Sequence, residues 1–192
     1  MVKVAIVCEG KGDKEFFEKL AIHLGFDVTR LFSFYIFGGK SFVLDATHKK
    51  YKDLKNEIDN DQIDKILFVV DSDSEKSDPA HNGYENTQVA LNSIIERLGF
   101  MAISHTYIMC EPITKKGYLE SLILSTVPEK QRNCIECFLA CSEFKSKEHH
   151  KAIFNDIYKL AYPNAPFDFK HENFDELKQK LRNLFADIAE DF

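Results

Sequence analysis

The stretch ILFVVDSDSE, residues 66–75, indicates the fold more clearly than any other part of the chain. Its first five residues are all apolar, as expected of a strand that is buried on both faces of a parallel sheet. The apolar run leads directly into Asp71 and Asp73, which a single serine separates. Ligands of open parallel sheets bind outside the carboxyl ends of the strands. The residues that follow each strand are therefore the first candidates for a functional site.

The segments around this stretch alternate between strand and helix patterns. Short apolar runs predict strands, and apolar residues at helical spacing predict helices. In chain order, the expected strands and helices are 2–7, 13–24, 31–37, 45–60, 66–70, 85–98 and 103–110. This order predicts an α/β fold, with a four-stranded, mostly parallel sheet between helices and right-handed crossovers.

From Gly117 onward the pattern becomes helical. Helices are expected at 117–125, 129–141, 147–161 and 174–189. Asn173 with Glu176 is expected to cap the last of them. We therefore expect an α/β domain over residues 1–115 and a helical extension over residues 116–192 that packs on it.

The composition is that of a soluble globular protein, with 44% hydrophobic and 29% charged residues among 192. The net charge of -6 argues against a surface coated in positive charge, which many non-specific nucleic-acid binders have. The apolar N-terminal stretch is too short for a signal peptide, and no apolar run approaches the ~20 residues of a membrane span. Five cysteines, an odd number, argue against a disulfide framework. We expect a reduced, cytoplasmic protein that does not contact a membrane.

Acidic residues follow three of the expected strands. Glu9 and Asp13 come after the first strand, Asp71 and Asp73 after the third, and Glu120 beyond the fourth. Crowded carboxylates raise one another's pKa values, and a bound divalent cation is the usual compensation. Such oxygen ligands suit Mg²⁺ or Mn²⁺ better than zinc. In a continuing strand Asp71 and Asp73 would point to the same side, where they could hold one ion or bridge two. Taken alone, Asp-Ser-Asp-Ser is more typical of an ordinary turn.

The turn after the first strand has residues suited to binding phosphate. Gly10, Lys11 and Gly12 follow Glu9 directly. The glycines would keep the turn tight and let the backbone approach a phosphate group. Lys11 would contact that phosphate, although an exposed turn lysine is the more ordinary alternative.

The order of these motifs resembles that of the Toprim domain. Its features are an apolar strand ending in Glu-Gly, an Asp four residues after the Glu, and Asp-x-Asp after a later apolar strand. The matching stretches are VCEGKGD at 7–13 and VVDSDSE at 69–75. The segment GYLESLIL at 117–124 resembles a stretch in small Toprim-like proteins. The resemblance covers about residues 2–115 and implies a four-stranded parallel sheet between helices.

The resemblance also implies roles for the acidic residues. Glu9 would be a metal ligand or a general acid/base, and Asp71 and Asp73 would hold Mg²⁺. Asp13 would complete the site as in OLD-type nucleases, and Glu120 would lie near it. Glu9, Asp71 and Asp73 are thus the expected catalytic residues. Two metal ions ~4 Å apart would activate a water and stabilise the leaving oxygen in phosphodiester cleavage.

The sequence therefore predicts a Mg²⁺-dependent (or Mn²⁺-dependent) phosphoryl-transfer enzyme of Toprim type, in the first place a nuclease on DNA or RNA. Nucleic acid is its expected partner, and a protein partner or a homo-oligomer stays open. One alternative is a non-catalytic Toprim-like module that binds nucleic acid or nucleotide. A further alternative is a nucleotide-sugar glycosyltransferase, which also uses Asp-x-Asp after an apolar strand but leaves Glu9 and Asp13 unexplained.

The remaining motif is a group of cysteines at helical spacing. Cys134, Cys137 and Cys141 would share one face of a helix. We expect them to pack in the core, because free cysteine behaves as a small hydrophobe. A zinc site completed by His149 or His150 is the less favoured alternative.

Overall fold

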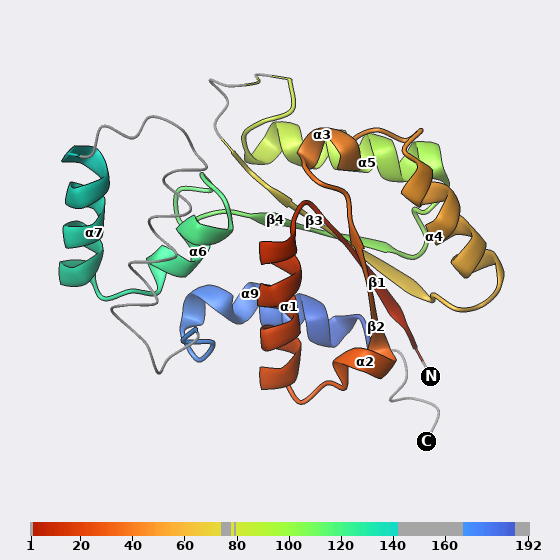
Figure 1. The fold of residues 1–192 in the computed structure, drawn as a ribbon, viewed down its shortest axis with the longest axis horizontal. Coiled ribbons are helices and arrows are strands. Elements are labelled where there is room, and N and C mark those ends of the chain that lie inside the picture. Colours follow the sequence, from red (N-terminus) through yellow and green to blue (C-terminus); the bar gives the residue numbers. More distant parts are fainter. Residues whose placement is uncertain (1, 74–77, 79, 142–166, 187–192) are drawn as a thin grey trace.

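A computed structural model describes residues 2–73, 78, 80–141 and 167–186 of the chain (Figure 1). It confirms the predicted α/β fold: four strands form one sheet in the order β2-β1-β3-β4, and every pairing is parallel. The strands are β1 (Val4–Cys8), β2 (Phe32–Ile36), β3 (Lys65–Asp71) and β4 (Ser104–Met109). The described helices are α1 (Lys11–His23), α2 (Val28–Leu31), α3 (Lys40–Val43), α4 (Lys49–Asp59), α5 (Tyr84–Leu98), α6 (Leu119–Ser125), α7 (Glu129–Cys141), the 3-10 helix η1 (Glu172–Phe174) and α9 (Asp175–Asn183).

The two central strands, β1 and β3, determine where the sheet ends. Both are almost entirely buried, which explains why their sequences are apolar on both faces. Their pairing sets Cys8 level with Val69, and Asp71 is level with Met109 of β4. The residues that follow β1 and β3 therefore emerge at the same edge of the sheet.

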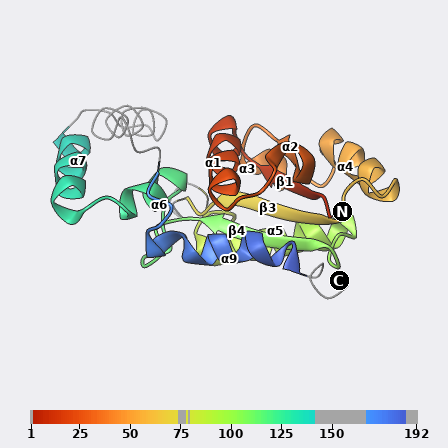
Figure 2. The ribbon, with the colours of Figure 1, turned by 90° about the horizontal axis from the view of Figure 1, so that it is seen from below.

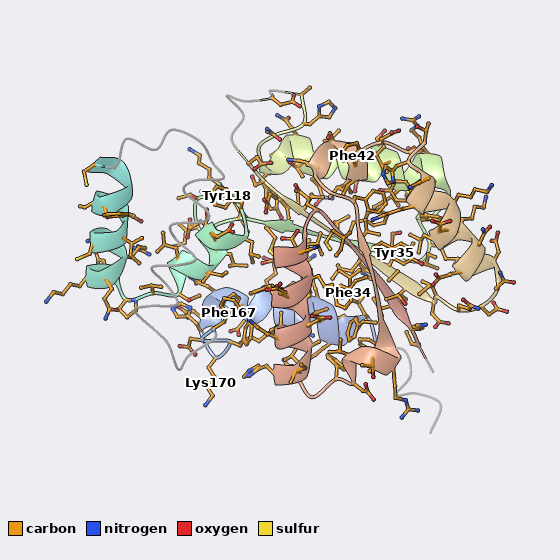
Figure 3. All side chains as sticks on the ribbon, in the orientation of Figure 1. Phe34, Tyr35, Phe42, Tyr118, Phe167 and Lys170 are labelled. Carbon is orange, nitrogen blue, oxygen red and sulfur yellow. The ribbon has the colours of Figure 1, made fainter. Side chains whose placement is uncertain are left out.

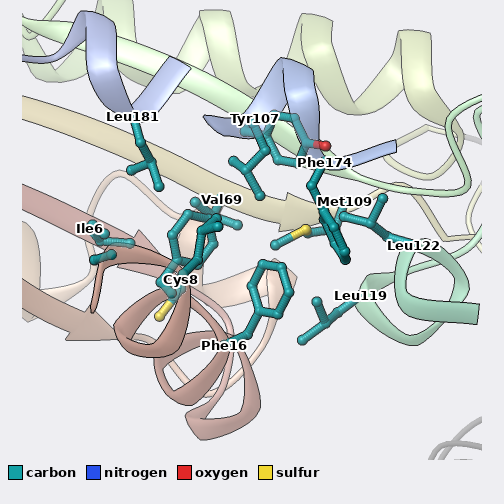
Figure 4. Packing of buried hydrophobic residues seen from close by; sticks show 14 of the residues in the cluster. Ile6, Cys8, Phe16, Val69, Tyr107, Met109, Leu119, Leu122, Phe174 and Leu181 are labelled. Atoms are coloured by element: carbon teal, nitrogen blue, oxygen red, sulfur yellow. The ribbon is translucent and has the colours of Figure 1, made fainter. Parts of the chain in front are cut away.

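Helices cover both faces of the sheet. On one face, α1, α6 and α9 bury Phe16, Leu122 and Leu177 in a cluster with Val69 and Met109. Figure 4 shows Phe16, Met109, Leu119 and Phe174 meeting in this layer. At the outer strand of the sheet, Phe34 of β2 lies beside α1, with the ammonium of Lys14 5.6 Å from its ring centroid (Figure 3).

The opposite face carries α3, α4 and α5. Val43, Leu54 and Leu91 from these helices form a second cluster with Val7 and Phe68 of the sheet. Val7 packs in this second cluster, whereas Ile6 and Cys8 pack in the first, because successive side chains of a strand point to opposite faces of the sheet.

The start of the helix expected at 45–60 and the cap of the last helix differ from the expectation. The helix expected at 45–60 begins only at Lys49, because Asp45 accepts hydrogen bonds from both the backbone and the hydroxyl of Thr47 and holds a turn there. The predicted cap of the last helix by Asn173 and Glu176 is wrong. His171 caps η1 instead, and the Asn173 amide donates to Ser125 of α6.

The second half of the chain contributes unequally to the core. Helices α6 and α9 bury apolar side chains against the sheet, whereas α7 lies beyond α6, away from the sheet (Figures 1 and 2). The division of the chain at residue 116 stays a prediction, and the helix expected at 147–161 lies outside the described residues. In the described part of the chain, no helix has the length and apolarity to cross a membrane.

The expected core packing of the cysteine face is wrong. Cys134, Cys137 and Cys141 are exposed on α7, and Ile135 on another face of this helix is buried. Ile135 belongs to the buried cluster that α1, α6 and α9 form on the sheet, and the three thiols are exposed. Cys8 and Cys110 are the buried cysteines.

Candidate metal centre

Glu9 follows β1 and is hydrogen-bonded to residues at the ends of β2 and β3, the two strands on either side of β1. Its backbone carbonyl accepts a hydrogen bond from Gly38, after β2, at 2.8 Å. Its side-chain Oε1 accepts from the backbone N–H of Asp71, at the end of β3, at 2.7 Å. Burial, together with the nearby carboxylates of Asp71, Asp73 and Asp13, raises the pKa of Glu9 to about 8, although the hydrogen bond from Asp71 acts in the opposite direction.

Asp71 is the last residue of β3 and only 4% exposed. Its Oδ1 accepts a hydrogen bond from the backbone N–H of Leu119, the first residue of α6, at 3.1 Å. Its own backbone N–H is the donor to Glu9. Leu119 thus holds the carboxylate of Asp71, and Glu9 holds its backbone, as a precisely placed ligand would need.

The predicted phosphate-binding turn is shorter than expected, because α1 begins at Lys11. Gly10 is its N-cap residue and donates its N–H to Oδ2 of Asp13 at 2.8 Å, which fixes the Asp13 carboxylate. A Cβ atom placed on Gly12 would meet nothing within 4 Å. Lys11 is exposed on the first turn of the helix and is not among the residues that line the adjacent cavity.

A cavity of about 300 Å³ lies at this edge of the sheet. Four predicted acidic residues line it, and each comes from a different element or its end: Glu9, Asp13, Asp71 and Glu120. Gly10 and Gly12 line it too, together with Gly38, Gly39 and Leu119. The structure therefore brings most of the predicted acidic set to one cavity.

Asp73 is the exception. The strand ends at Asp71, and Asp73 has a φ of 60°, a left-handed conformation that Asp adopts more readily than most residues. Its N–H donates to the carbonyl of Gly117 at 2.7 Å. The strand does not continue to Asp73, so the condition under which Asp71 and Asp73 would point to the same side is not met. Asp73 lines a second cavity, of about 580 Å³, which shares Glu9 with the first.

Lys40 is a residue of this region that the sequence analysis missed. It follows Gly38 and Gly39 after β2, and its side chain is 9% exposed. It lines the second cavity together with Glu9 and Asp73. The sequence places Lys40 after a strand end, as it does Glu9, but it does not show the oxygen atoms that surround the ammonium.

The donor chemistry suits a hard divalent cation, since every candidate ligand is a carboxylate oxygen. Within the described residues, however, no three acidic, histidine or cysteine side chains already form a metal-holding group. The site therefore fits Mg²⁺ or Mn²⁺ in the chemistry of its ligands, and binding would require the carboxylates to move together.

Comparisons of the chain with family models, with curated proteins and with solved structures found no match. The resemblance to the Toprim domain accordingly stays a prediction that rests on the motifs themselves. The roles of the acidic residues rest on their chemistry and on the geometry described above.

Proposed function

We propose that the protein is a Mg²⁺- or Mn²⁺-dependent phosphoryl-transfer enzyme of Toprim type, a nuclease that acts on DNA or RNA phosphodiesters. The observation that carries this proposal is the hydrogen bond between Glu9 and Asp71 beside a carboxylate-lined cavity at the end of the sheet. The chemistry of such a cavity is that of a divalent cation and a phosphate group.

The residues of the cavity have distinct parts in the proposed reaction. A bound divalent cation would stabilise negative charge on a phosphoryl oxygen. Asp71, Asp13 and Glu120 would hold this cation, and the hydrogen bonds to Leu119 and Gly10 keep the first two in place. Glu9 has a pKa of about 8 when no cation is bound, so it can hold or release a proton near neutral pH. A group of this kind can act as a general acid or base.

The protein surface would offer few positive charges to hold the substrate of the proposed nuclease. The net charge of -6 gives the surface little non-specific affinity for phosphates. A long nucleic acid would therefore need a local basic groove or a protein partner.

The test is cleavage of single- and double-stranded DNA and RNA with Mg²⁺ or Mn²⁺, comparing the wild type with Asp71→Asn. The asparagine keeps an oxygen for the Leu119 N–H but loses the negative charge. We expect the rate of cleavage to fall about 100-fold or more. Asp59→Asn, at the exposed end of α4, is the matched control and should cleave like the wild type. No cleavage of any of these substrates by the wild type would refute the proposal.

A second candidate function is a non-catalytic Toprim-like module that binds nucleic acid or nucleotide. It is favoured by the lack, in the described part of the chain, of an assembled group of three metal-ligating side chains. This module would retain nucleic acid in a filter-binding assay without cutting it. The geometry does not favour the glycosyltransferase alternative. That alternative uses Asp71 and Asp73 together to bind a metal, and the two residues line different cavities.

A further inference from the structure

The Lys40 ammonium is buried within a shell of oxygen atoms. Its Nζ donates to the backbone carbonyls of Asp71 at 2.8 Å and Ser72 at 3.3 Å. It also donates to the Asn82 side-chain oxygen at 3.0 Å and to the Thr87 hydroxyl at 2.7 Å. These oxygens come from the end of β3, from the loop before α5 and from α5 itself. The shell therefore ties three segments of the chain around one positive charge.

Such a shell is what a cation requires inside a protein. A buried ammonium is costly unless oxygen atoms replace the water that it loses. Two carbonyls, an amide oxygen and a hydroxyl surround Lys40, and these are also typical ligands of a bound metal ion. These acceptors engage the three protons of the ammonium, so the part that the geometry gives Lys40 is to position other groups.

Asp73 is the charged partner of this ammonium. Its Oδ2 lies 3.8 Å from Nζ of Lys40, and its side chain is 13% exposed. Both residues line the second cavity, whereas Asp71 lines the first. A divalent ion bound to Asp73 would lie close to the ammonium, and two cations at this distance repel each other.

We infer that Lys40 occupies the place of a second metal ion, so that the site binds a single divalent cation and Asp73 is the counter-ion of Lys40. The single cation lies in the cavity lined by Glu9 and Asp71. Lys40 acts as a positioning residue, because it holds the backbone of the Asp71–Asp73 turn and thereby the direction of the Asp71 carboxylate. This inference rests on the proposed function, since it concerns the metal of that same site.

The first experiment counts bound Mn²⁺ from the electron paramagnetic resonance signal of the free ion, on the full chain. We expect one Mn²⁺ per wild-type chain. Asp71→Asn should weaken binding about tenfold or more, because it removes a ligand charge. Asp73→Asn should change the affinity by no more than about threefold, and the Asp59→Asn control should bind like the wild type.

The outcomes separate this inference from the proposed function. Two Mn²⁺ ions per wild-type chain would overturn the inference and leave the proposed function standing. The inference also fails if Asp73→Asn weakens binding as much as Asp71→Asn does. A wild type that binds no Mn²⁺ would remove the proposed function and the inference together.

A second experiment tests the oxygen shell itself. Lys40→Ala removes the ammonium and leaves its oxygen partners behind, so a small cation from solution should replace it. We expect ammonium chloride to raise the melting temperature of this variant above its value in tetramethylammonium chloride at equal ionic strength. The wild type should show no such difference. Equal melting temperatures in the two salts would contradict the inference, and if the variant does not fold in either salt, the Asp73→Asn measurement decides.

Discussion

Glu9 is the carboxyl of the first cavity whose pKa is raised by burial. Burial, and after it the negative charge of Asp71, raises its pKa from 4.5 to about 8 in the metal-free protein. A carboxyl with a raised pKa contributes stability that is complete below its unfolded pKa and is lost as the pH rises through its folded pKa. Between about pH 4.5 and pH 8 the folded state therefore loses stability because of Glu9.

This gives a prediction for Glu9→Gln, which keeps an oxygen to accept the Asp71 N–H. In EDTA at pH 9 the variant should be more stable than the wild type by about 2 kcal/mol, and at pH 4 the gain should vanish. Urea unfolding at a series of pH values measures the difference. Asp59→Asn is the control, with no pH-dependent gain expected. A gain that is the same at pH 4 and pH 9 would show that ionisation of Glu9 is not its cause.

Strand-end reasoning located Glu9 and Asp71 correctly at one edge of the sheet, because both follow apolar runs that only a central strand explains. It could not find the role of Lys40. A lysine after two glycines is typical of an exposed turn, and the oxygens that bury it come from residues 71–87, far along the chain. Contacts of this separation have no signature in the local sequence.

At the scale of elements, the start of α6 is a tightly packed junction. Gly117 has a φ of 92°, and its carbonyl accepts the hydrogen bond from Asp73. A Cβ atom on Gly117 would lie 2.1 Å from the hydroxyl oxygen of Ser121, which is on the first turn of α6. The chain can therefore turn into α6 in this conformation only because Gly117 has no side chain.

Gly117→Ala should accordingly lower the free energy of unfolding by about 2 kcal/mol or more, from backbone strain together with the clash. The matched control is Gly12→Ala in α1. No atom lies within 4 Å of its added methyl group, and alanine is the better helix former, so it should be neutral or stabilising by up to about 1 kcal/mol. Chemical denaturation of both variants gives the comparison. Equal midpoints for the two would mean that the junction is not tightly packed.

The order of strands and longer helices was predictable, because apolar runs and helical stripes alternate along the first half of the chain. Element ends were less predictable. The short helices α2 and α3 have four residues each, which is too few to show a helical pattern of apolar residues in the sequence. The late start of α4 depends on the turn at Asp45, a single side-chain interaction.

At the scale of the whole molecule, the cysteines divide into a buried and an exposed group. Burial raises the pKa of Cys8 to about 12 and that of Cys110 to about 11. Since the thiolate is the reactive form, both thiols should be unreactive while the chain is folded. The other three cysteines are exposed on α7.

We therefore expect a thiol-specific disulfide reagent at pH 8 to label three cysteines quickly and all five in denaturant. Counting the released chromophore before and after adding guanidinium chloride measures both numbers. Cys134→Ser should reduce the fast count to two and leave the slow count unchanged. Rapid labelling of all five thiols in the absence of denaturant would contradict the burial of Cys8 and Cys110.

The exposed thiols also show where sequence patterns stop being informative. Cys134, Cys137 and Cys141 share a helix face with the spacing of a core stripe, and cysteine is among the most buried residue types. Which face of α7 meets the rest of the chain depends on the helix's placement beyond α6, and nothing within the helix specifies that placement.

The carboxylates of the first cavity differ in how firmly the chain holds them. Glu9 follows β1 and Asp71 ends β3, so changing their separation would mean parting two central strands that are hydrogen-bonded on both sides. Asp13 and Glu120 belong to the first turns of α1 and α6, where a carboxylate can change its rotamer without parting any strands. A larger cation such as Ca²⁺ would thus be accommodated by Asp13 and Glu120, and the choice between ions of different radius would depend on the rotamers open to these two side chains.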